Sequence, residues 1–144
     1  MLDRDWIAAR IPHQGSMCLL DAVVEWSESA IRCTASSHRL ADNPLRAEGR
    51  LGIVAGIEYA AQAMAVHGAL LAPPKGQPRQ GYLASVRNVD LLAERLDDQA
   101  DDLDIAAERL AGDGNNILYQ FSVRAGERLL LTGRAAVILD SESL

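Results

Sequence analysis

The feature that most constrains the fold is the segment RLGIVAGIEYAAQAMAVHGALL, residues 50–71, which is apolar almost from end to end. It predicts one long helix over about 52–71, because the Pro73–Pro74 pair that follows cannot continue a helix. A helix that is hydrophobic nearly all round is enclosed by the rest of its fold. The remaining chain must therefore supply elements that surround it.

The segments on either side of this helix have the patterns of strands. Residues 30–37 and 116–124 alternate apolar and polar side chains, which is the period of a half-buried strand, and 17–26 is a mainly apolar run. Further strands are expected over 81–92, 101–111 and 128–139. This order predicts an α+β fold in which an antiparallel sheet wraps around the one long helix. The length of 144 residues indicates one domain, 1–144.

Charge and cysteine content narrow the class of protein. A formal net charge of −6 argues against a general nucleic-acid binder. Cys18 and Cys33 are the only cysteines and form no CxxC pattern, and the N-terminal residues do not read as a secretory signal. We therefore expect a reduced, cytoplasmic protein with both thiols in its core. No apolar run reaches the ~20 residues of a membrane span, so no membrane association is predicted.

Glu58 is the unusual residue of the apolar helix, because a carboxylate is rarely buried without a partner. Two interpretations stay open. Glu58 is either a carboxylate at the open end of the fold, where it is solvated or paired with an arginine, or a catalytic acid in apolar surroundings. Gln62 lies four residues further on and shares the face of Glu58. Its amide is therefore expected to donate a hydrogen bond to the carboxylate and fix its orientation.

The three histidines are expected to have different roles. His38 lies where a strand gives way to the polar loop 38–50, so it is either the base that such an acid needs or an ordinary loop histidine. His67 falls on the helix face opposite Glu58 and is expected to be structural, as is His13 in a turn. The histidines lack the HxxxH or HExxH spacing of a metal site, so no metal is predicted.

An acidic run over residues 94–104 carries six acids and only Arg95 as a base. It lacks the glycine and the ligand order of a calcium loop. We interpret it as a solvated connection between strands.

Two segments resemble one known family. IPHQGSMCLLDAVVEW, residues 11–26, is similar to the Pro-His pair and apolar segment that open the hotdog-fold 3-hydroxyacyl-[acyl carrier protein] dehydratases, and GIEYAAQAMA, 56–65, resembles their Glu-x-x-x-Gln helix signature. The resemblance covers most of the chain and implies a hotdog fold. HRLADNPLRAEGRLG stands where better-known members have a shorter segment with Phe-Pro-Gly, so that Glu58 follows His38 by twenty positions. This spacing is similar to a divergent branch, the dehydratase-like proteins of aryl-polyene pigment clusters.

The resemblance implies a catalytic dyad, usually contributed by opposite subunits of a dimer. His38 would remove the α-proton of a 3-hydroxyacyl thioester, Glu58 would protonate the leaving hydroxyl to give the trans-2-enoyl thioester, and Gln62 would orient Glu58. Main-chain N–H groups around Gly52 or Gly56 would stabilise the thioester oxygen at the start of the helix. The reaction requires no metal or diffusible cofactor.

The implied partners are an acyl carrier protein and a second hotdog subunit, either identical or related. A carrier protein is acidic, so its docking site is expected to be basic. Arg50, with Arg39 and Arg46, flanks the candidate site, and residues 75–87 carry three basic residues and no acid. Scattered surface arginines would give the same pattern. Subunits are expected to associate through the edge strands of their sheets.

Two other functions fit the same features. A hotdog acyl thioesterase would use the helix carboxylate for hydrolysis without a base from the 38–50 loop. A non-catalytic hotdog subunit would complete or stabilise a partner that carries the activity. The sequence does not decide the length or type of the acyl chain, or between carrier protein and coenzyme A.

Overall fold

The structure is a computed structural model that describes residues 1–11, 15–71, 81–112 and 115–139. Its helices are α1 (Arg4–Ala8) and α2 (Ala55–Leu70), with short 3-10 turns η1 (Gly15–Met17) and η2 (Ser37–Arg39). Its strands are β1 (Leu2–Asp3), β2 (Ala22–Trp26), β3 (Ala30–Ala35), β4 (Gly81–Leu91), β5 (Leu103–Gly112), β6 (Asn116–Ala125) and β7 (Arg128–Leu139).

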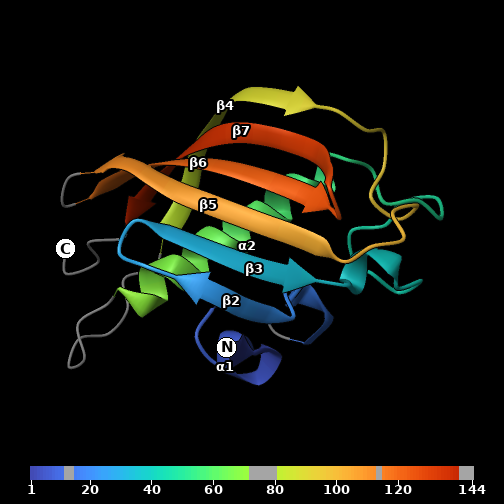
Figure 1. Ribbon diagram of the computed structural model, residues 1–144, viewed down its shortest axis with the longest axis horizontal. Coiled ribbons are helices and arrows are strands. Elements are labelled where there is room, and N and C mark those ends of the chain that lie inside the picture. The colour runs from blue at the N-terminus through green and yellow to red at the C-terminus, as the bar shows by residue number, and fades with distance from the viewer. Residues whose placement is uncertain (12–14, 72–80, 113–114, 140–144) are drawn as a thin grey trace.

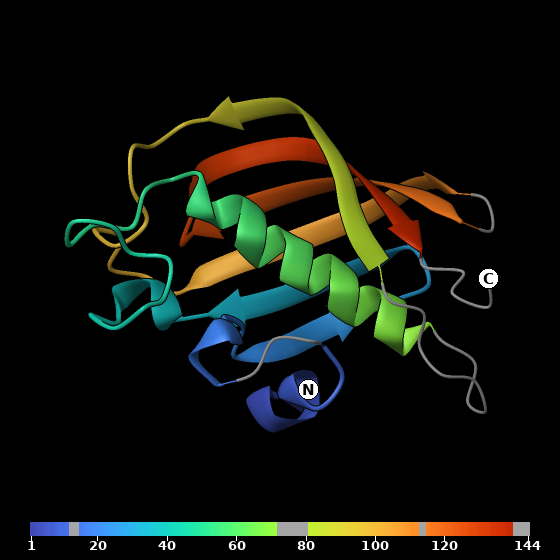
Figure 2. The ribbon, with the colours of Figure 1, turned by 180° about the vertical axis from the view of Figure 1, so that it is seen from behind.

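One antiparallel sheet contains all seven strands, in the order β1-β2-β3-β5-β6-β7-β4. The sheet curves around α2, which crosses its concave face (Figures 1 and 2). Alternate residues of β6, such as Tyr119 and Phe121, are buried beneath this helix, while Gln120 between them faces outward. The predicted α+β fold, with a sheet wrapped around one long apolar helix, is confirmed.

The N-terminal part differs from the prediction. The expected strand 17–26 begins only at Ala22, because the main chain of residues 17–19 is bonded to the Gln62 side chain rather than to a neighbouring strand: the Leu19 N–H donates to Oε1 of Gln62. The short helix α1 was not predicted. It begins where the Asp3 carboxylate accepts a hydrogen bond from the Trp6 N–H at 2.9 Å, which is an N-cap.

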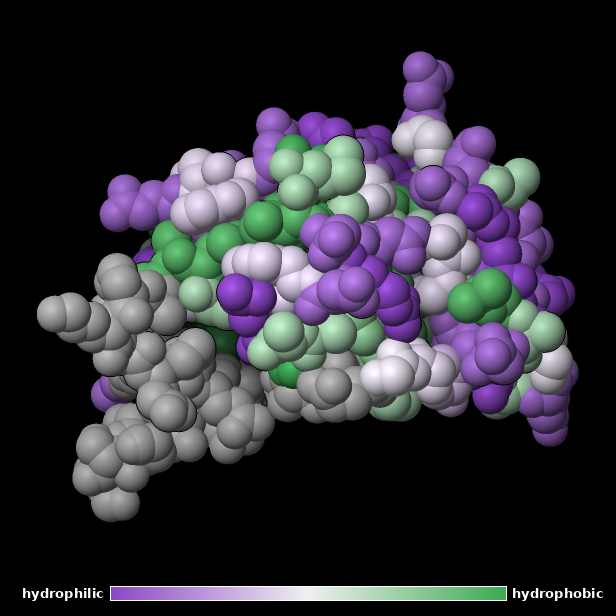
Figure 3. All heavy atoms as spheres, turned by 90° about the horizontal axis from the view of Figure 1, so that it is seen from below, coloured by the Kyte–Doolittle hydropathy of each residue, from purple (hydrophilic) through white to green (hydrophobic). Residues whose placement is uncertain are grey.

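The expectations for the cysteines are confirmed: Cys18 and Cys33 are buried free thiols. Burial raises the pKa of Cys33 to about 12, so the thiol stays protonated. Hydrophobic and hydrophilic residues are interspersed on the side of the molecule that carries α1 and β2 (Figure 3). None of the helices within the described ranges has the length and hydropathy that crossing a membrane requires.

Candidate active site

The end of β3 leads into η2, and a buried chain of hydroxyl groups joins η2 to α2. The Ser37 hydroxyl donates to the Leu19 carbonyl (2.8 Å) and accepts from the Tyr59 hydroxyl (2.8 Å). The Asn43 amide donates to Tyr59 (3.1 Å) and to the Ser37 carbonyl (2.9 Å). Burial raises the pKa of Tyr59, which keeps its hydroxyl a donor. Since Tyr59 follows Glu58 in the chain, these bonds hold the turn that carries His38 beside the first turns of α2.

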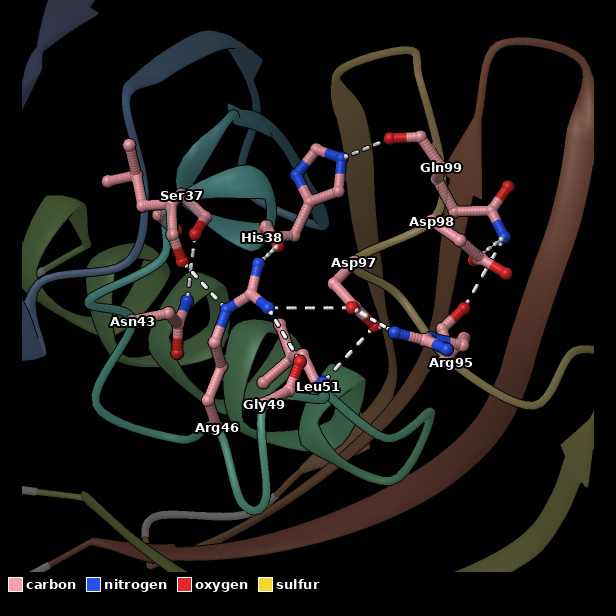
Figure 4. A network of polar contacts seen from close by, with 11 residues as sticks. Ser37, His38, Asn43, Arg46, Gly49, Leu51, Arg95, Asp97, Asp98 and Gln99 are labelled. Carbon is pink, nitrogen blue, oxygen red and sulfur yellow. Dashed lines mark hydrogen bonds and ion pairs between the residues drawn. The ribbon is translucent and has the colours of Figure 1, made fainter.

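The His38 ring is completely buried and is held from one side (Figure 4). Its Nε2 lies 3.1 Å from the Gln99 carbonyl oxygen and 3.0 Å from that of Asp101. Because a carbonyl can only accept, the proton is assigned to Nε2 and the lone pair to Nδ1. Within the described residues Nδ1 is buried and has no hydrogen-bond partner. Burial lowers the pKa of the ring, which favours the neutral form that can accept a proton at Nδ1.

Asp97 is the centre of the polar network beside His38 (Figure 4). Its carboxylate accepts hydrogen bonds from the Leu51 N–H (3.1 Å) and from Nε of Arg95 (2.8 Å), and Nη1 of Arg46 lies 3.4 Å away. The Arg95 guanidinium holds the pKa of Asp97 well below its ordinary value. With its side chain only 6% exposed, Asp97 departs from the prediction that residues 94–104 are a solvated connection, whereas Glu94, Asp98, Asp101 and Asp102 are exposed as expected. The run also packs against the residues that precede α2.

The same segment, residues 94–101, holds both parts of the candidate site. The Ile53 N–H donates to the Glu94 carbonyl (3.1 Å) and the Leu96 N–H to the Leu51 carbonyl (2.8 Å), so the approach to α2 pairs with this segment. Five residues further on, its carbonyls hold the His38 ring. Arg46 completes the arrangement by donating to the His38 carbonyl (3.3 Å).

Glu58 lies in the first turns of α2 and is half-buried. Its helix end and η2 lie at the same end of the molecule in both ribbon views (Figures 1 and 2). The structure thus brings the regions of the two predicted dyad residues together, through Tyr59 and Ser37. It gives the His38 ring other partners than the Glu58 carboxylate, namely the carbonyls of 99 and 101.

Gln62 is completely buried, and its partners differ from the expected one. Oε1 accepts from the Leu19 N–H at 2.9 Å, and Nε2 donates to the Met17 carbonyl at 2.7 Å. The amide therefore positions the main chain of residues 17–19. The sequence had instead predicted a hydrogen bond from this amide to the Glu58 carboxylate. These partners lie more than forty residues away in the sequence, so helical spacing could not reveal them.

The predicted binding residues lie in different environments. Gly56 is buried, its N–H donates to the Ile53 carbonyl at 2.9 Å, and a Cβ there would lie 2.6 Å from Cδ2 of Leu131, so a larger residue would have to displace this buried side chain of β7. Gly52 is exposed, a Cβ there would meet open space, and its N–H makes no hydrogen bond within the described part of the chain. Arg50 is exposed and forms no ion pair with the described residues.

His67 has the structural environment that its sequence position predicts. Its Nδ1 lies 2.7 Å from the Tyr119 hydroxyl and its Nε2 lies 2.8 Å from the Ser27 carbonyl, so the ring accepts from Tyr119 and donates to Ser27. His13 and residues 75–80 of the basic segment lie outside the described residues. Among the residues that are described, no three His, Cys, Asp or Glu side chains come together as a metal site would require.

A hollow of about 500 Å³ lies over β3, β5 and β6 and is lined by Trp26, Arg32, Glu108 and Gln120 among others. Gln120 and Glu108 point away from α2, so this hollow is on the outer face of the sheet. It is separate from the candidate site.

Comparison with known proteins identifies relatives of this chain. The ApeP-like family, described as ApeP dehydratase, matches residues 6–143. The dehydratase heterocomplex ApeI:P from Xenorhabdus doucetiae is similar with a TM-score of 0.82 and 23% identity, over 95% of this chain and 92% of that one. A mutant thioesterase from Pseudomonas aeruginosa has a TM-score of 0.68 and 11% identity, over 95% and 93%. A thioesterase from Haemophilus influenzae has 0.61 and 14%, over 83% and 77%. A search of curated proteins gave no match. The shared architecture is the hotdog fold.

Proposed function

The chain belongs to the ApeP-like dehydratase family, and from this premise we propose that it removes water from a 3-hydroxyacyl thioester carried by an acyl carrier protein, giving the trans-2-enoyl thioester. The observation that carries the proposal is Nδ1 of His38, a buried lone pair without a partner among the described residues. A buried polar atom in this state is destabilising and needs an explanation, of which a catalytic role is one. Aryl-polyene or fatty-acid synthesis would use such a reaction.

In the proposed mechanism His38 is the base. Two carbonyls bind Nε2–H, fix the tautomer and stabilise the imidazolium that forms when Nδ1 takes the α-proton. The lowered pKa keeps the ring ready to accept this proton at neutral pH. Since Nδ1 is covered in the isolated chain, substrate binding has to displace part of what covers it, as closing and opening loops do in many enzymes.

Glu58 is proposed as the acid that protonates the leaving hydroxyl. The thioester oxygen gains negative charge as the α-proton leaves, and the exposed Gly52 N–H near the start of α2 is the better placed of the two predicted donors, because the Gly56 N–H is already bonded to Ile53. Gln62 becomes a positioning residue, which acts through residues 17–19.

The proposed partners are an acyl carrier protein, which the exposed Arg50 would help to attract, and a second hotdog subunit. The likeness to the ApeI:P heterocomplex supports a related rather than an identical subunit. The edge strand β4 is the proposed site of pairing, either in a homodimer or in a heterodimer.

A mass measurement on a loaded carrier protein tests the reaction. With 3-hydroxyacyl carrier protein as substrate, dehydration lowers the mass by one water and leaves the thioester intact. Glu58→Gln and His38→Ala should each lower the rate at least ~10²-fold, the low end for one general acid or base. Glu28→Gln is the matched control, because Glu28 is exposed in the turn between β2 and β3 and lies outside the proposed site.

Other outcomes would replace the proposal. Release of the carrier's thiol, insensitive to His38→Ala, would identify a thioesterase. No change of mass with the chain alone or with a hotdog partner, together with a partner activity that rises on mixing and is unaffected by Glu58→Gln, would identify a non-catalytic subunit.

A further inference from the structure

The two edges of the sheet are built differently. β1 has two residues and leads directly into α1, whereas β4 has eleven residues and pairs only with β7 among the described strands (Figures 1 and 2). A long edge presents a row of main-chain donors and acceptors to any strand that can pair with them. β4 is therefore the edge at which another chain can extend the sheet.

On the helix side of the sheet, β4 exposes apolar side chains. Leu83 lies opposite Val137, which packs against the core, yet Leu83 is 41% exposed. Leu91 lies opposite the buried Leu131 and is 46% exposed. These leucines line the rim of the core, and a chain paired with β4 would cover them.

On the outer face, β4 carries a pair of like charges. Arg87 lies directly opposite Arg134 of β7, both are exposed, and neither forms an ion pair with the described residues. Like charges directly opposite each other are destabilising in a sheet. Gln120, the neighbour of Arg134 on the other side, is neutral. The acid on this face of β4 is Asp90, beyond a register shift and opposite Thr132.

Pairing between two copies of this strand would bring the arginines together. A full-length antiparallel pair of β4 strands, residues 81–91, places residue 86 opposite itself. The Arg87 side chains of the two copies then become diagonal neighbours, roughly 7–8 Å apart, and each has Arg134 beside it. A partner strand with Asp or Glu at this place would meet the same arginines with the opposite charge.

We propose that the arginine pair Arg87–Arg134 selects the partner at the β4 edge: a related hotdog subunit with acidic side chains on the outer face of its own edge strand. This inference rests on the proposed edge pairing and adds the chemistry by which the partner is recognised. Repulsion between arginines disfavours the homodimer, and attraction favours the heterodimer. The exposed leucines supply the apolar contact that either dimer would share.

Mixing the chain with a charge-reversed copy of itself tests the proposal without any other protein. The dissociation constant of the mixture of wild type with R87E/R134E, measured by sedimentation at low salt, should be at least tenfold lower than that of either protein alone. The difference should shrink as the salt concentration rises, since salt screens exposed charges. R124E/R128E is the control with the same charge change, because Arg124 on β6 and Arg128 at the start of β7 are exposed and do not face β4.

An equal gain with the control pair, or a wild-type homodimer as tight as the mixture, overturns the role of the arginines. Leu91→Asp should weaken every dimer at this edge, and association unaffected by it overturns the edge itself. The dehydration assay is a separate measurement. A mixed dimer that forms but dehydrates nothing contradicts the proposed reaction alone, whereas dehydration without charge-dependent pairing contradicts this inference alone.

Discussion

His38 and His67 are both completely buried, both have a pKa lowered by burial, and both donate Nε2–H to main-chain carbonyls. They differ at the second nitrogen. Nδ1 of His67 accepts a hydrogen bond from the Tyr119 hydroxyl at 2.7 Å, whereas Nδ1 of His38 has no partner among the described residues. Burial and the direction of the pKa shift therefore do not distinguish the two residues, but hydrogen-bond satisfaction does.

We propose that this difference separates a structural from a functional histidine. His67 joins α2 to β6 and to the turn after β2, and its ring leaves nothing for a substrate to bind. His38 is held as firmly at Nε2, but its buried Nδ1 has no hydrogen-bond partner among the described residues. Leaving a buried polar group unsatisfied costs about 1–3 kcal/mol of stability. Substitution by glutamine is a matched test of both sites. The glutamine amide N–H can take the place of Nε2–H, but glutamine has no nitrogen at the position of Nδ1.

The largest effect is expected for His38→Gln. The glutamine amide can still donate to the carbonyls of Gln99 and Asp101, but the base is lost, so the dehydration rate should fall at least ~10²-fold. The free energy of unfolding in urea should change by less than about 1 kcal/mol, because the substituted nitrogen had no partner to lose. A loss of stability with unchanged activity would show that His38 is a structural residue like His67.

Asp97→Asn should have the next largest effect, because it loosens the segment that holds the His38 ring. Asparagine can still accept from the Leu51 N–H and from Nε of Arg95 at Oδ1, but its amide nitrogen takes the place of Oδ2 and faces Nη2 of Arg95 and Nη1 of Arg46, donor against donor. We expect a loss of about 2 kcal/mol of stability, within the range for bonds to charged groups. Its rate should fall through kcat more than through KM, because Asp97 is proposed to position the base rather than to bind the substrate.

The control for this change is Asp102→Asn, at an exposed carboxylate that pairs with Arg39 near the same loop. An exposed pair contributes at most about 1 kcal/mol. Equal effects of the two substitutions on kcat would contradict a positioning role for Asp97.

His67→Gln should have a smaller effect, and on stability alone. The Ser27 carbonyl keeps a donor, but the Tyr119 hydroxyl loses its acceptor, which should lower the free energy of unfolding by about 1–2 kcal/mol. Tyr119→Phe combined with His67→Gln should cost less than the sum of the two changes, because both remove one bond. A fall in kcat in the single variant would break the distinction between the two histidines.

The sequence predicted those features that follow from local pattern. Periodicity and composition predicted the long helix, the alternating strand that contains Tyr119 and the burial of both cysteines. The contacts that define the site were not, because their partners are distant in the chain. His38 meets Gln99 across 61 positions and Gln62 meets Leu19 across 43. The acidic run looked like a solvated connection because nothing local marks Asp97 apart from its neighbours.

The smallest effect is expected in the dependence on pH, where the two histidines should separate. A buried histidine with a pKa below its ordinary 6.5 binds a proton in the unfolded chain before it does so in the folded one. Neither histidine therefore changes the pH dependence of stability above about pH 7. As the pH falls below 6.5, each lowers the free energy of unfolding by at most about 1.4 kcal/mol per pH unit. His67→Gln should remove its share of this slope in urea titrations and leave the pH dependence of kcat/KM unchanged. The acid limb of the wild-type profile should lie below pH 6.5 and belong to His38, because in the proposed reaction only its Nδ1 takes a proton. If the acid limb moves in the His67→Gln variant, the assignment of the base to His38 is wrong.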